Sequence, residues 1–264
     1  MPQSARRIRL LGREMDAVTC EEVMATIAAR AAERRKTLIA NHNLHSLRLW
    51  DREPAMARLY ARAEIVEIDS MPLVAWGRLM GLKLGREHRN TYLDWREDFW
   101  RMASAGGLRV FHLGCKPGVG AAAREALLKQ YPGAVIGERH GYFDLEGAEN
   151  EAVLAEIAAF EPDVLFVGMG MPRQERWIEA NWDRLPECPL LPIGAAFDYE
   201  AGVVPTPPRW TAAIGMEWLA RFLAEPGRLF HRYFVEPWGL VPAMARDVAG
   251  RFGRKRERFE VAEA

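Results

Sequence analysis

Three polar side chains stand directly after two short apolar runs of the sequence, where they could carry out acid–base and binding chemistry. Asn41 and Asn43 follow the run Thr37–Ala40, and Asp69 follows the run Ile65–Ile68. A carboxylate in such a position can act as a general base toward a hydroxyl group, and asparagine side chains can orient a sugar. The alternative role of Asp69 is that of an N-cap for the helix that follows it.

A glycine-containing loop follows the apolar run Leu108–Leu113. It reads Gly114-Cys-Lys116-Pro117-Gly118-Val-Gly and leads into a helix-like stretch. Glycines allow a close approach of the backbone to a ligand, and the free N–H groups at a helix start attract phosphate. The loop matches neither the P-loop nor the G-x-G-x-x-G pattern. It is interpreted as a diphosphate cradle, with an ordinary strand-to-helix loop as the alternative.

A second loop of this kind follows the apolar run Val164–Val167. It reads Gly168-Met-Gly170-Met-Pro172-Arg173-Gln174-Glu175 and again opens a helix, with proline at a favourable early position. Two glycines and three consecutive polar side chains suit the base, ribose or phosphate of a nucleotide. The alternative is that Glu175 only stabilises the first helical turn, while Arg173 and Gln174 lie on the surface.

The elements that must position these loops alternate between strand and helix. A capping box at Thr19–Glu22 predicts a helix to about Glu33. Buried strands are predicted at Thr37–Ala40, Ile65–Ile68, Leu108–Leu113, Ala134–Ile136, Val164–Val167 and Leu190–Ile193, and helices at about Ser46–Ala63, Pro72–Met80, Val119–Gln130, Ala148–Phe160 and Pro172–Arg184. This alternation predicts a Rossmann-like α/β sandwich with a mostly parallel sheet. Ligands of such sheets bind at the carboxyl ends of the strands.

Composition excludes several classes of protein. The 264 residues are 49% hydrophobic and 27% charged, which is ordinary for a folded, water-facing chain. Lysine plus arginine equals aspartate plus glutamate at 36 each, so the net charge gives no reason to expect a nucleic-acid partner. No apolar run reaches the length of a membrane-spanning helix, and the arginine-rich N-terminus does not read as a secretory signal. We therefore expect a cytoplasmic protein.

Metal chemistry is disfavoured by the residue pattern. Cys20, Cys115 and Cys188 are widely spaced, which argues against a disulfide framework and a cysteine metal site. His42 and His45 have no evident third ligand nearby. The sequence thus predicts neither a metal site nor a bound cofactor.

The pattern changes after about residue 204. The proline-rich segment VVPTPPRW is followed by helix-like stretches, so we predict a core at residues 1–204 and a helical appendage at residues 205–264. The appendage is rich in aromatic residues and ends in the basic stretch AGRFGRKRERF. Rings and cations together are typical of a segment seated on a membrane surface. The alternatives are a hairpin packed on the core with a solvated tail, or a face that meets a partner subunit in a homo-oligomer.

The motifs in this order resemble those of the WecG/TagA/CpsF family, glycosyltransferase family 26, over about residues 8–238. The motifs are Asn41-x-Asn43, Asp69 before an apolar helix, Gly114-x-Lys116-Pro117-Gly118, GMGMPRQE, Phe197-Asp198-Tyr199-x-x-Gly202 and GMEWLARFLAEPGRLFHRY. The resemblance implies transfer of a sugar, such as N-acetylmannosamine or glucose, from a UDP-sugar to a polyprenyl-diphosphate-linked sugar during surface or extracellular polysaccharide synthesis. It further implies an inverting, metal-independent reaction at the inner face of the cytoplasmic membrane.

The resemblance also assigns roles to residues. Asp69 would be the general base and Asn43 would position a sugar, while Arg221 and Arg228 would neutralise the leaving diphosphate. The UDP-sugar would be surrounded by Asn41, Gly114, Lys116, Pro117, Gly118, Gly168, Gly170, Pro172, Arg173, Gln174, Glu175 and Asp198. Asp94 and Asp198 are alternative bases. The sequence departs from the usual family pattern at Asn41, at Ser70, at Thr206-Pro207-Pro208 and at His231.

Two other functions compete with the transferase. One is a non-catalytic, membrane-associated scaffold that binds a nucleotide sugar. The other is a nicotinamide-dependent oxidoreductase of the same fold class, which is disfavoured because the glycine fingerprint and its acidic ribose partner are missing.

Overall fold

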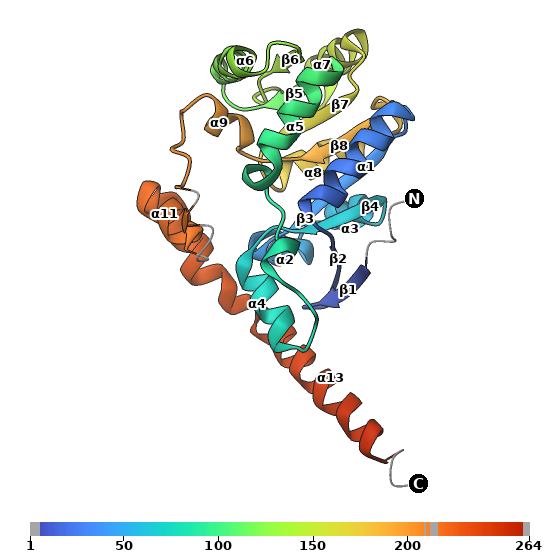
Figure 1. The fold of residues 1–264 in the computed structure, drawn as a ribbon, viewed down its shortest axis with the longest axis vertical. Coiled ribbons are helices and arrows are strands. Elements are labelled where there is room, and N and C mark those ends of the chain that lie inside the picture. Colours follow the sequence, from blue (N-terminus) through green and yellow to red (C-terminus); the bar gives the residue numbers. More distant parts are fainter. Residues whose placement is uncertain (1–5, 209, 212–215, 261–264) are drawn as a thin grey trace.

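The computed structural model describes residues 6–208, 210–211 and 216–260, with the side chains of Arg6, Arg228 and residues 252–260 outside the description (Figure 1). The chain forms a central sheet with helices on both faces. A run of helices follows it along one side of the molecule.

All six predicted strands are present, and they pair in one parallel sheet. They are β3 (Thr37–His42), β4 (Ala63–Ile68), β5 (Arg109–Gly114), β6 (Val135–Arg139), β7 (Val164–Gly168) and β8 (Pro189–Pro192). Their order across the sheet is β4-β3-β8-β7-β5-β6, and every pairing is parallel. The predicted Rossmann-like fold class is confirmed.

Helices cover the two faces of the sheet with separate apolar clusters. One face packs against α1 (Cys20–Ala32), α5 (Tyr92–Gly106), α6 (Val119–Gln130) and α9 (Ala196–Glu200), and its core includes Trp95, Phe99 and Phe166. The other face packs against α3 (Pro54–Tyr60), α7 (Gly147–Phe160) and α8 (Arg173–Asn181). These aromatic and aliphatic side chains are fully removed from water, which stabilises the layered arrangement.

Local sequence signals explain where several helices begin and end. The capping box at Thr19 and Glu22 is present at the start of α1, as predicted. The single helix predicted at Ser46–Ala63 is wrong, because one helix ends at Trp50 and Pro54 begins a second one. The chain forms α2 (Leu44–Trp50) and then α3, whose first residue is Pro54. Proline has no N–H to donate and is tolerated only in the first turn of a helix.

Sequence reasoning missed α5 and a short antiparallel hairpin. The hairpin consists of β1 (Arg6–Leu10) and β2 (Arg13–Ala17) and turns at Leu11 and Gly12, both with positive φ. Two consecutive left-handed residues are the geometry of a type I′ turn. The hairpin packs with α4 (Met71–Leu79) around a third apolar cluster.

The C-terminal segment docks on this third cluster. It comprises α11 (Glu217–Ala224), α12 (Pro226–Phe230), η3 (His231–Val235), η4 (Glu236–Leu240) and α13 (Val241–Glu260), and the far end of α13 projects away from the body (Figure 1). Leu240, Ala243 and Met244 pack against the hairpin and α4. Asp247 accepts hydrogen bonds from the Leu11 backbone N–H (2.8 Å) and from the Trp76 indole N–H (3.0 Å). The start of α13 is therefore fixed to the core.

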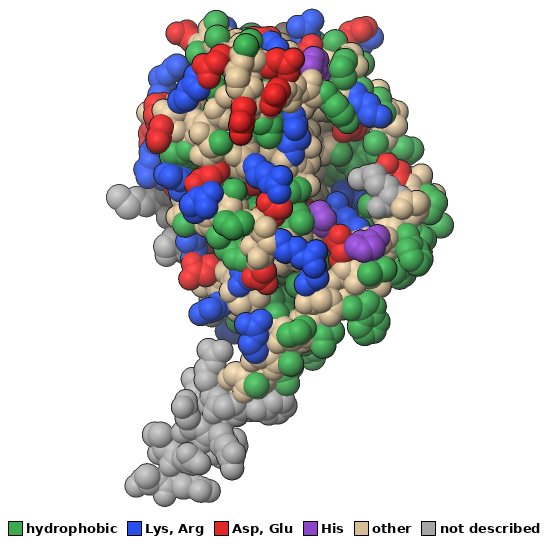
Figure 2. Space-filling view, turned by 180° about the vertical axis from the view of Figure 1, so that it is seen from behind, with side chains coloured by type: hydrophobic (Ala, Val, Ile, Leu, Met, Phe, Trp, Pro, Cys, Tyr) green, Lys and Arg blue, Asp and Glu red, His purple; other side chains and the backbone are tan. Residues whose placement is uncertain are grey.

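The same segment exposes many large hydrophobic side chains. They include Trp218, Leu223, Phe230, Phe234, Val235, Trp238 and Val241, and Trp210 just before the segment is exposed as well. Figure 2 shows hydrophobic side chains gathered on this side of the molecule. None of the helices in the described ranges has the length and apolar character needed to cross a membrane. The division of the chain at residue 205 and the occupant of this apolar surface stay predictions.

Replacing Asp247 by alanine should loosen α13. The Leu11 and Trp76 N–H groups would lose their acceptor, which should lower the free energy of unfolding by about 1–3 kcal/mol. Urea unfolding and hydrogen exchange at the Leu11 amide measure this. Asp247→Asn keeps one acceptor oxygen and should show the smaller effect. Equal exchange in the wild type and the alanine variant would contradict this docking role.

Candidate active site

A cavity of about 420 Å³ lies at the carboxyl ends of the sheet strands. It is located where β3 and β8 lie side by side. The chain leaves β3 toward α3 on one face and leaves β8 toward α9 on the other, so the loops diverge and open a crevice. Residues from β3, β4, the loops after β7 and β8, α5 and the C-terminal segment line it. Its volume suits a substrate of nucleotide-sugar size.

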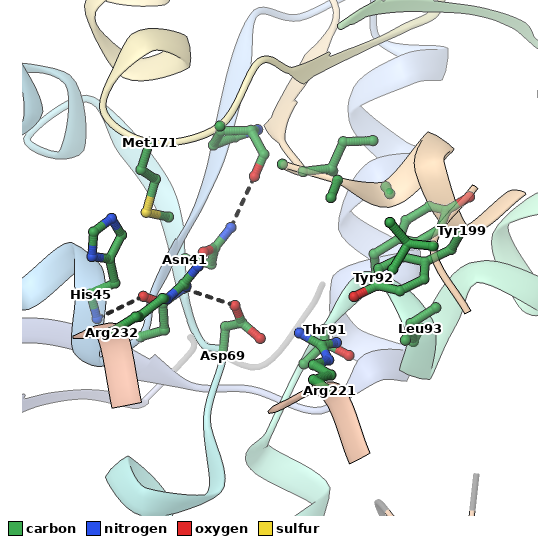
Figure 3. Close-up of a pocket in the computed structure, with 18 of the residues that line it drawn as sticks. Asn41, His45, Asp69, Thr91, Tyr92, Leu93, Met171, Tyr199, Arg221 and Arg232 are labelled. Carbon is green, nitrogen blue, oxygen red and sulfur yellow. Dashed lines mark hydrogen bonds between the residues drawn. The ribbon is translucent and has the colours of Figure 1, made fainter. Parts of the chain in front are cut away.

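Asp69 and Asn43 form a hydrogen-bonded pair in this cavity. The Asn43 side-chain N–H group donates to Asp69 Oδ2 at 3.1 Å (Figure 3). Asn43 Oδ1 meanwhile accepts from the backbone N–H groups of His45 and Ser46, both at 3.0 Å. Asn43 is thus the N-cap of α2, and this fixed side chain orients the carboxylate. The two residues, which follow different predicted strands, thus meet at one edge of the sheet. Ser70, and not Asp69, occupies the N-cap position of α4.

The surroundings of Asp69 shift its affinity for a proton. Burial raises the pKa of the Asp69 carboxyl to about 6, while Arg221 and the hydrogen bond from Asn43 oppose this rise. Arg89 and Arg232 also favour the charged form. A carboxylate with a pKa near 6 is ionised at neutral pH and is still basic enough to accept a proton from a hydroxyl group.

A buried chain of charges links the core to the C-terminal segment beside Asp69. Arg89 donates to both Asp94 oxygens at 2.7 and 2.6 Å and to Glu217 Oε2 at 2.9 Å. Glu217 Oε1 in turn lies 2.6 Å from Arg221 Nη2. Arg221 also lies over the Tyr199 ring at 5.6 Å. Arg221 is therefore held in the cavity by Glu217 of its own helix and by Tyr199 of α9.

The C-terminal segment makes a second contact at the rim of the cavity. His45 Nδ1 lies 2.6 Å from Glu236 Oε2, which connects α2 to η4. Arg232 lines the cavity on the same side, near His45 in Figure 3. The predicted arginine Arg228 lies in α12, and its side chain falls outside the described residues. The segment thus brings Arg221 and Arg232 into the site.

The loop after β7 is only partly in the cavity. Gly170 and Gln174 line it, whereas Gly168, Pro172, Arg173 and Glu175 do not. Gln174 Oε1 accepts from the Gly170 N–H (3.0 Å) and the Gly194 N–H (3.2 Å), so its side chain ties two loops together. Arg173 donates to the Gly141 and Phe143 carbonyl oxygens, away from the cavity.

Glu175 is fully buried behind this loop. It accepts a hydrogen bond of 2.8 Å from the Gln174 side-chain N–H group, and burial raises the pKa of its carboxyl to about 7. Its contact with Gln174 indicates a supporting position. Binding of the nucleotide by Pro172, Arg173 and Glu175 stays a prediction.

The structure does not bring the loop after β5 into the cavity. Lys116, Pro117 and Gly118 are exposed at the start of α6 and do not line it. Gly114 packs against Gly168, where an added Cβ would lie 2.4 Å from the Gly168 carbonyl oxygen. Asp198 lies in α9, outside the cavity lining, with its side chain directed to Cys115. Of the predicted nucleotide-binding residues, Asn41, Gly170 and Gln174 line the cavity.

Sequence reasoning missed several residues that the fold places here. Arg89 and Glu217 are buried in the charge chain, and Glu67 and Asn90 lie at the cavity floor. The burial of Arg89 could not be predicted from its own stretch of sequence, because its partner Glu217 is 128 residues away. Glu67 sits within an apolar strand, and that position was a usable signal.

No group of three or more His, Cys, Asp and Glu side chains that could hold a metal ion occurs among the residues the structure describes. The predicted metal independence is a statement about the reaction and stays a prediction. The polar residues that line the cavity around Asp69 include amides, two arginines, two histidines and the carboxyls of Glu67, Glu225 and Glu236, and aliphatic and aromatic side chains make up much of the rest.

Fold and cavity define a Rossmann-like α/β class of enzyme in which the buried Asp69 carboxyl shares a cavity with Arg221 and Arg232. Residues 8–254 match the model of the Glycosyl transferase WecG/TagA/CpsF family, and the chain belongs to this family. The resemblance read from the motifs is therefore confirmed. The family assignment favours a transferase over both the oxidoreductase and the non-catalytic scaffold.

Curated relatives share about a quarter of the residues. A protein of Staphylococcus aureus strain MRSA252 is 28% identical over 233 residues, which cover 84% of this chain and 87% of the relative. Its counterpart in strain NCTC 8325 / PS 47 is 27% identical over the same length and coverage. Both are named N-acetylglucosaminyldiphosphoundecaprenol N-acetyl-beta-D-mannosaminyltransferase.

Replacing Glu217 by glutamine should destabilise the protein. Arg89 and Arg221 would lose the negative charge that lies between them, and breaking a buried ion pair costs about 3–5 kcal/mol. The measurement is urea unfolding, with limited proteolysis of α11 as a second readout. Glu97→Gln on the exposed face of α5 is the matched control and should change stability by less than about 0.5 kcal/mol. Equal stability of the two variants would show that the charge chain does not hold the segment.

Proposed function

We propose that this enzyme transfers a sugar from a UDP-sugar to a polyprenyl-diphosphate-linked sugar acceptor, with Asp69 as the general base. The observation that carries the proposal is the Asp69 carboxylate in a cavity at the switch point of the sheet, held by Asn43 and flanked by Arg221. The names of the relatives support N-acetylmannosamine as the sugar and an N-acetylglucosaminyl diphosphate lipid as the acceptor.

The reaction proceeds as a single displacement. Asp69 accepts the proton of the acceptor hydroxyl, and the acceptor oxygen forms a bond to the anomeric carbon of the donor sugar. The bond between this carbon and the UDP oxygen breaks, and UDP leaves with the electron pair. Attack from the face opposite UDP inverts the anomeric configuration and gives a β-linkage from an α-linked donor. A positioned base contributes about 10²–10⁴-fold to such a step.

Arginines would stabilise the charge that develops on the leaving diphosphate. Arg221 and Arg232 line the cavity, and Arg228 lies on the helix between them in sequence. Guanidinium groups bind phosphate oxygens in a bidentate manner, and fixed cations act strongly in a site shielded from water. This supports a metal-independent reaction. Asn41, Gly170 and the Tyr199 ring would contact the nucleotide sugar.

A lipid-linked acceptor requires the site to work beside a membrane. The C-terminal segment that carries Arg221 and Arg232 also exposes Leu223, Phe230 and Trp238. Aromatic side chains partition into the headgroup region of a bilayer, so this face would seat the enzyme on the inner surface of the cytoplasmic membrane. A homo-oligomer that buries the same face is the alternative, and detergent-free sedimentation with and without vesicles separates the two.

Replacing Asp69 by asparagine should lower turnover by about 10²–10⁴-fold, because the acceptor hydroxyl loses its base. The assay is acceptor-dependent UDP release from UDP-N-acetylmannosamine, with N-acetylglucosaminyl diphosphate lipid in detergent and EDTA present. UDP affinity should stay within about threefold, and the matched control Asp183→Asn, on the exposed 3-10 turn after α8, should keep full activity. Wild-type turnover in Asp69→Asn would overturn the assigned base.

The pH dependence should report the ionisation of Asp69. The carboxyl has a pKa of about 6, so kcat/KM should fall about tenfold per unit as the pH drops below this value. Arg221 lowers this pKa, so the acid limb of residual activity should move to higher pH in Arg221→Gln. A pH-rate profile that stays flat down to pH 4.5 would contradict a base with this environment.

A further inference from the structure

The floor of the cavity holds three buried polar atoms that lack a hydrogen-bond partner within the described part of the chain. They are Glu67 Oε1, Asn90 Oδ1 and Trp95 Nε1. All three residues line the cavity, and their side chains are nearly inaccessible to solvent, with at most 4% of each residue exposed. Two oxygen atoms and one N–H group of residues that line the cavity are therefore buried without a hydrogen-bond partner among the residues that the structure describes.

The orientation of these groups is fixed by their neighbours. The Asn90 side-chain N–H group donates to the Val18 carbonyl oxygen at 2.7 Å, which fixes the amide and leaves Asn90 Oδ1 without a donor in the described ranges. Glu67 pairs in register with Asn41 of β3 and points to the same face of β4 as Asp69, two residues later. The indole N–H group of Trp95 lies near the Glu67 carboxyl without making a hydrogen bond of standard geometry.

Unpartnered polar atoms at a buried position destabilise a protein. Each lacks the hydrogen bond it makes with water in the unfolded chain, and folded proteins keep few such atoms without a reason. An apolar residue in place of Glu67 would avoid this cost in a cavity that Ile39 and Leu191 also line. A bound ligand group would instead supply the missing partners.

We propose that Glu67, Asn90 and Trp95 form a subsite for a polar ring substituent of a hexose, a hydroxyl or acetamido group, and that Glu67 determines which sugar is accepted. The proposal rests on the proposed function. The Trp95 N–H group would donate to a hydroxyl or carbonyl oxygen, and Asn90 Oδ1 would accept from an O–H or N–H group. A site built to form such bonds rejects sugars that lack the matching group.

The protonation of Glu67 separates its role from that of Asp69. Burial and the nearby Asp69 carboxylate raise the pKa of Glu67 well above its ordinary value, which favours the neutral carboxyl. A neutral carboxyl can both donate and accept a hydrogen bond, whereas it does not act as a base. Glu67 therefore binds and discriminates, and Asp69 removes the proton.

The test compares Glu67→Leu and Glu67→Gln with the wild type and with Glu64→Leu. Glu64 lies on the same strand but outside the cavity, and it pairs with Arg30 at 2.6 Å. Calorimetry measures affinity for UDP, UDP-N-acetylmannosamine, UDP-N-acetylglucosamine and UDP-glucose. Steady-state kinetics measure the KM for N-acetylglucosaminyl diphosphate lipid, and thermal unfolding measures stability.

Glu67→Leu should keep UDP affinity and an equal or higher Tm, while one sugar-dependent quantity falls about tenfold or more. Loss of the affinity gained over UDP assigns the subsite to the donor sugar, whereas a raised acceptor KM with unchanged donor affinity assigns it to the acceptor sugar. Glu67→Gln keeps an acceptor oxygen and should show a smaller loss with altered preference among the donors. Glu64→Leu should lower Tm and change no sugar affinity.

Unchanged sugar affinity and acceptor KM in both Glu67 variants would overturn the subsite. A second result would also overturn it. If Glu67→Leu lowered Tm as much as Glu64→Leu does and also lost affinity for UDP, Glu67 would have a structural role only. If the wild type binds neither UDP nor any UDP-sugar, the proposed function itself fails. The affinity of the wild type for UDP therefore distinguishes failure of the subsite from failure of the proposed function.

Discussion

The buried ion pair between Arg89 and Glu217 is the interaction on which the completed site depends. It connects the loop before α5 to α11 across a gap of 128 residues in sequence. Buried ion pairs contribute little net stability compared with apolar packing, but they require one specific geometry. Because Glu217 also binds Arg221 at 2.6 Å, the geometry that satisfies Arg89 also directs Arg221 toward Asp69. The core supplies the base, and this contact supplies the cation beside it.

The two buried carboxyls of the site lower the stability of the folded protein. Glu67 near the end of β4 and Asp69 just after it are carboxyls two residues apart, and burial raises the pKa of both. Each would be better solvated at the surface, so both reduce stability. Asn43 offsets part of this effect at Asp69 because its amide is already fixed as the cap of α2. Among the described residues, Glu67 Oε1 has only the nearby Trp95 N–H group, without a hydrogen bond of standard geometry, and a ligand would supply the missing partner in the proposed subsite.

Local signals in the sequence predict the sheet well and the site only in part. Apolar runs such as Val164–Val167 fix the strands, and parallel pairing then brings Asn43 and Asp69 to one edge. The glycine loops were harder to interpret, because a glycine can allow close approach of either a ligand or another backbone segment. At Gly114 the close neighbour is the Gly168 backbone, which an added Cβ would clash with. Arg89 could not be predicted, because burial of its charge depends on a residue contributed by a distant helix.

One short helix of the C-terminal segment, α11, has both a side that is buried against the core and an exposed apolar side. Within α11, Glu217 is buried against the core, whereas Leu223 is 71% exposed. The buried side carries the carboxylate that orients Arg221, and the exposed side carries the apolar surface proposed to meet lipid. Because a helix moves as a rigid unit, any rotation that moves Leu223 also moves Glu217 and Arg221. A surface that holds Leu223 therefore also restricts the position of Arg221, so contact with the acceptor's membrane would reinforce the geometry that Arg89 and Glu217 already impose on the site.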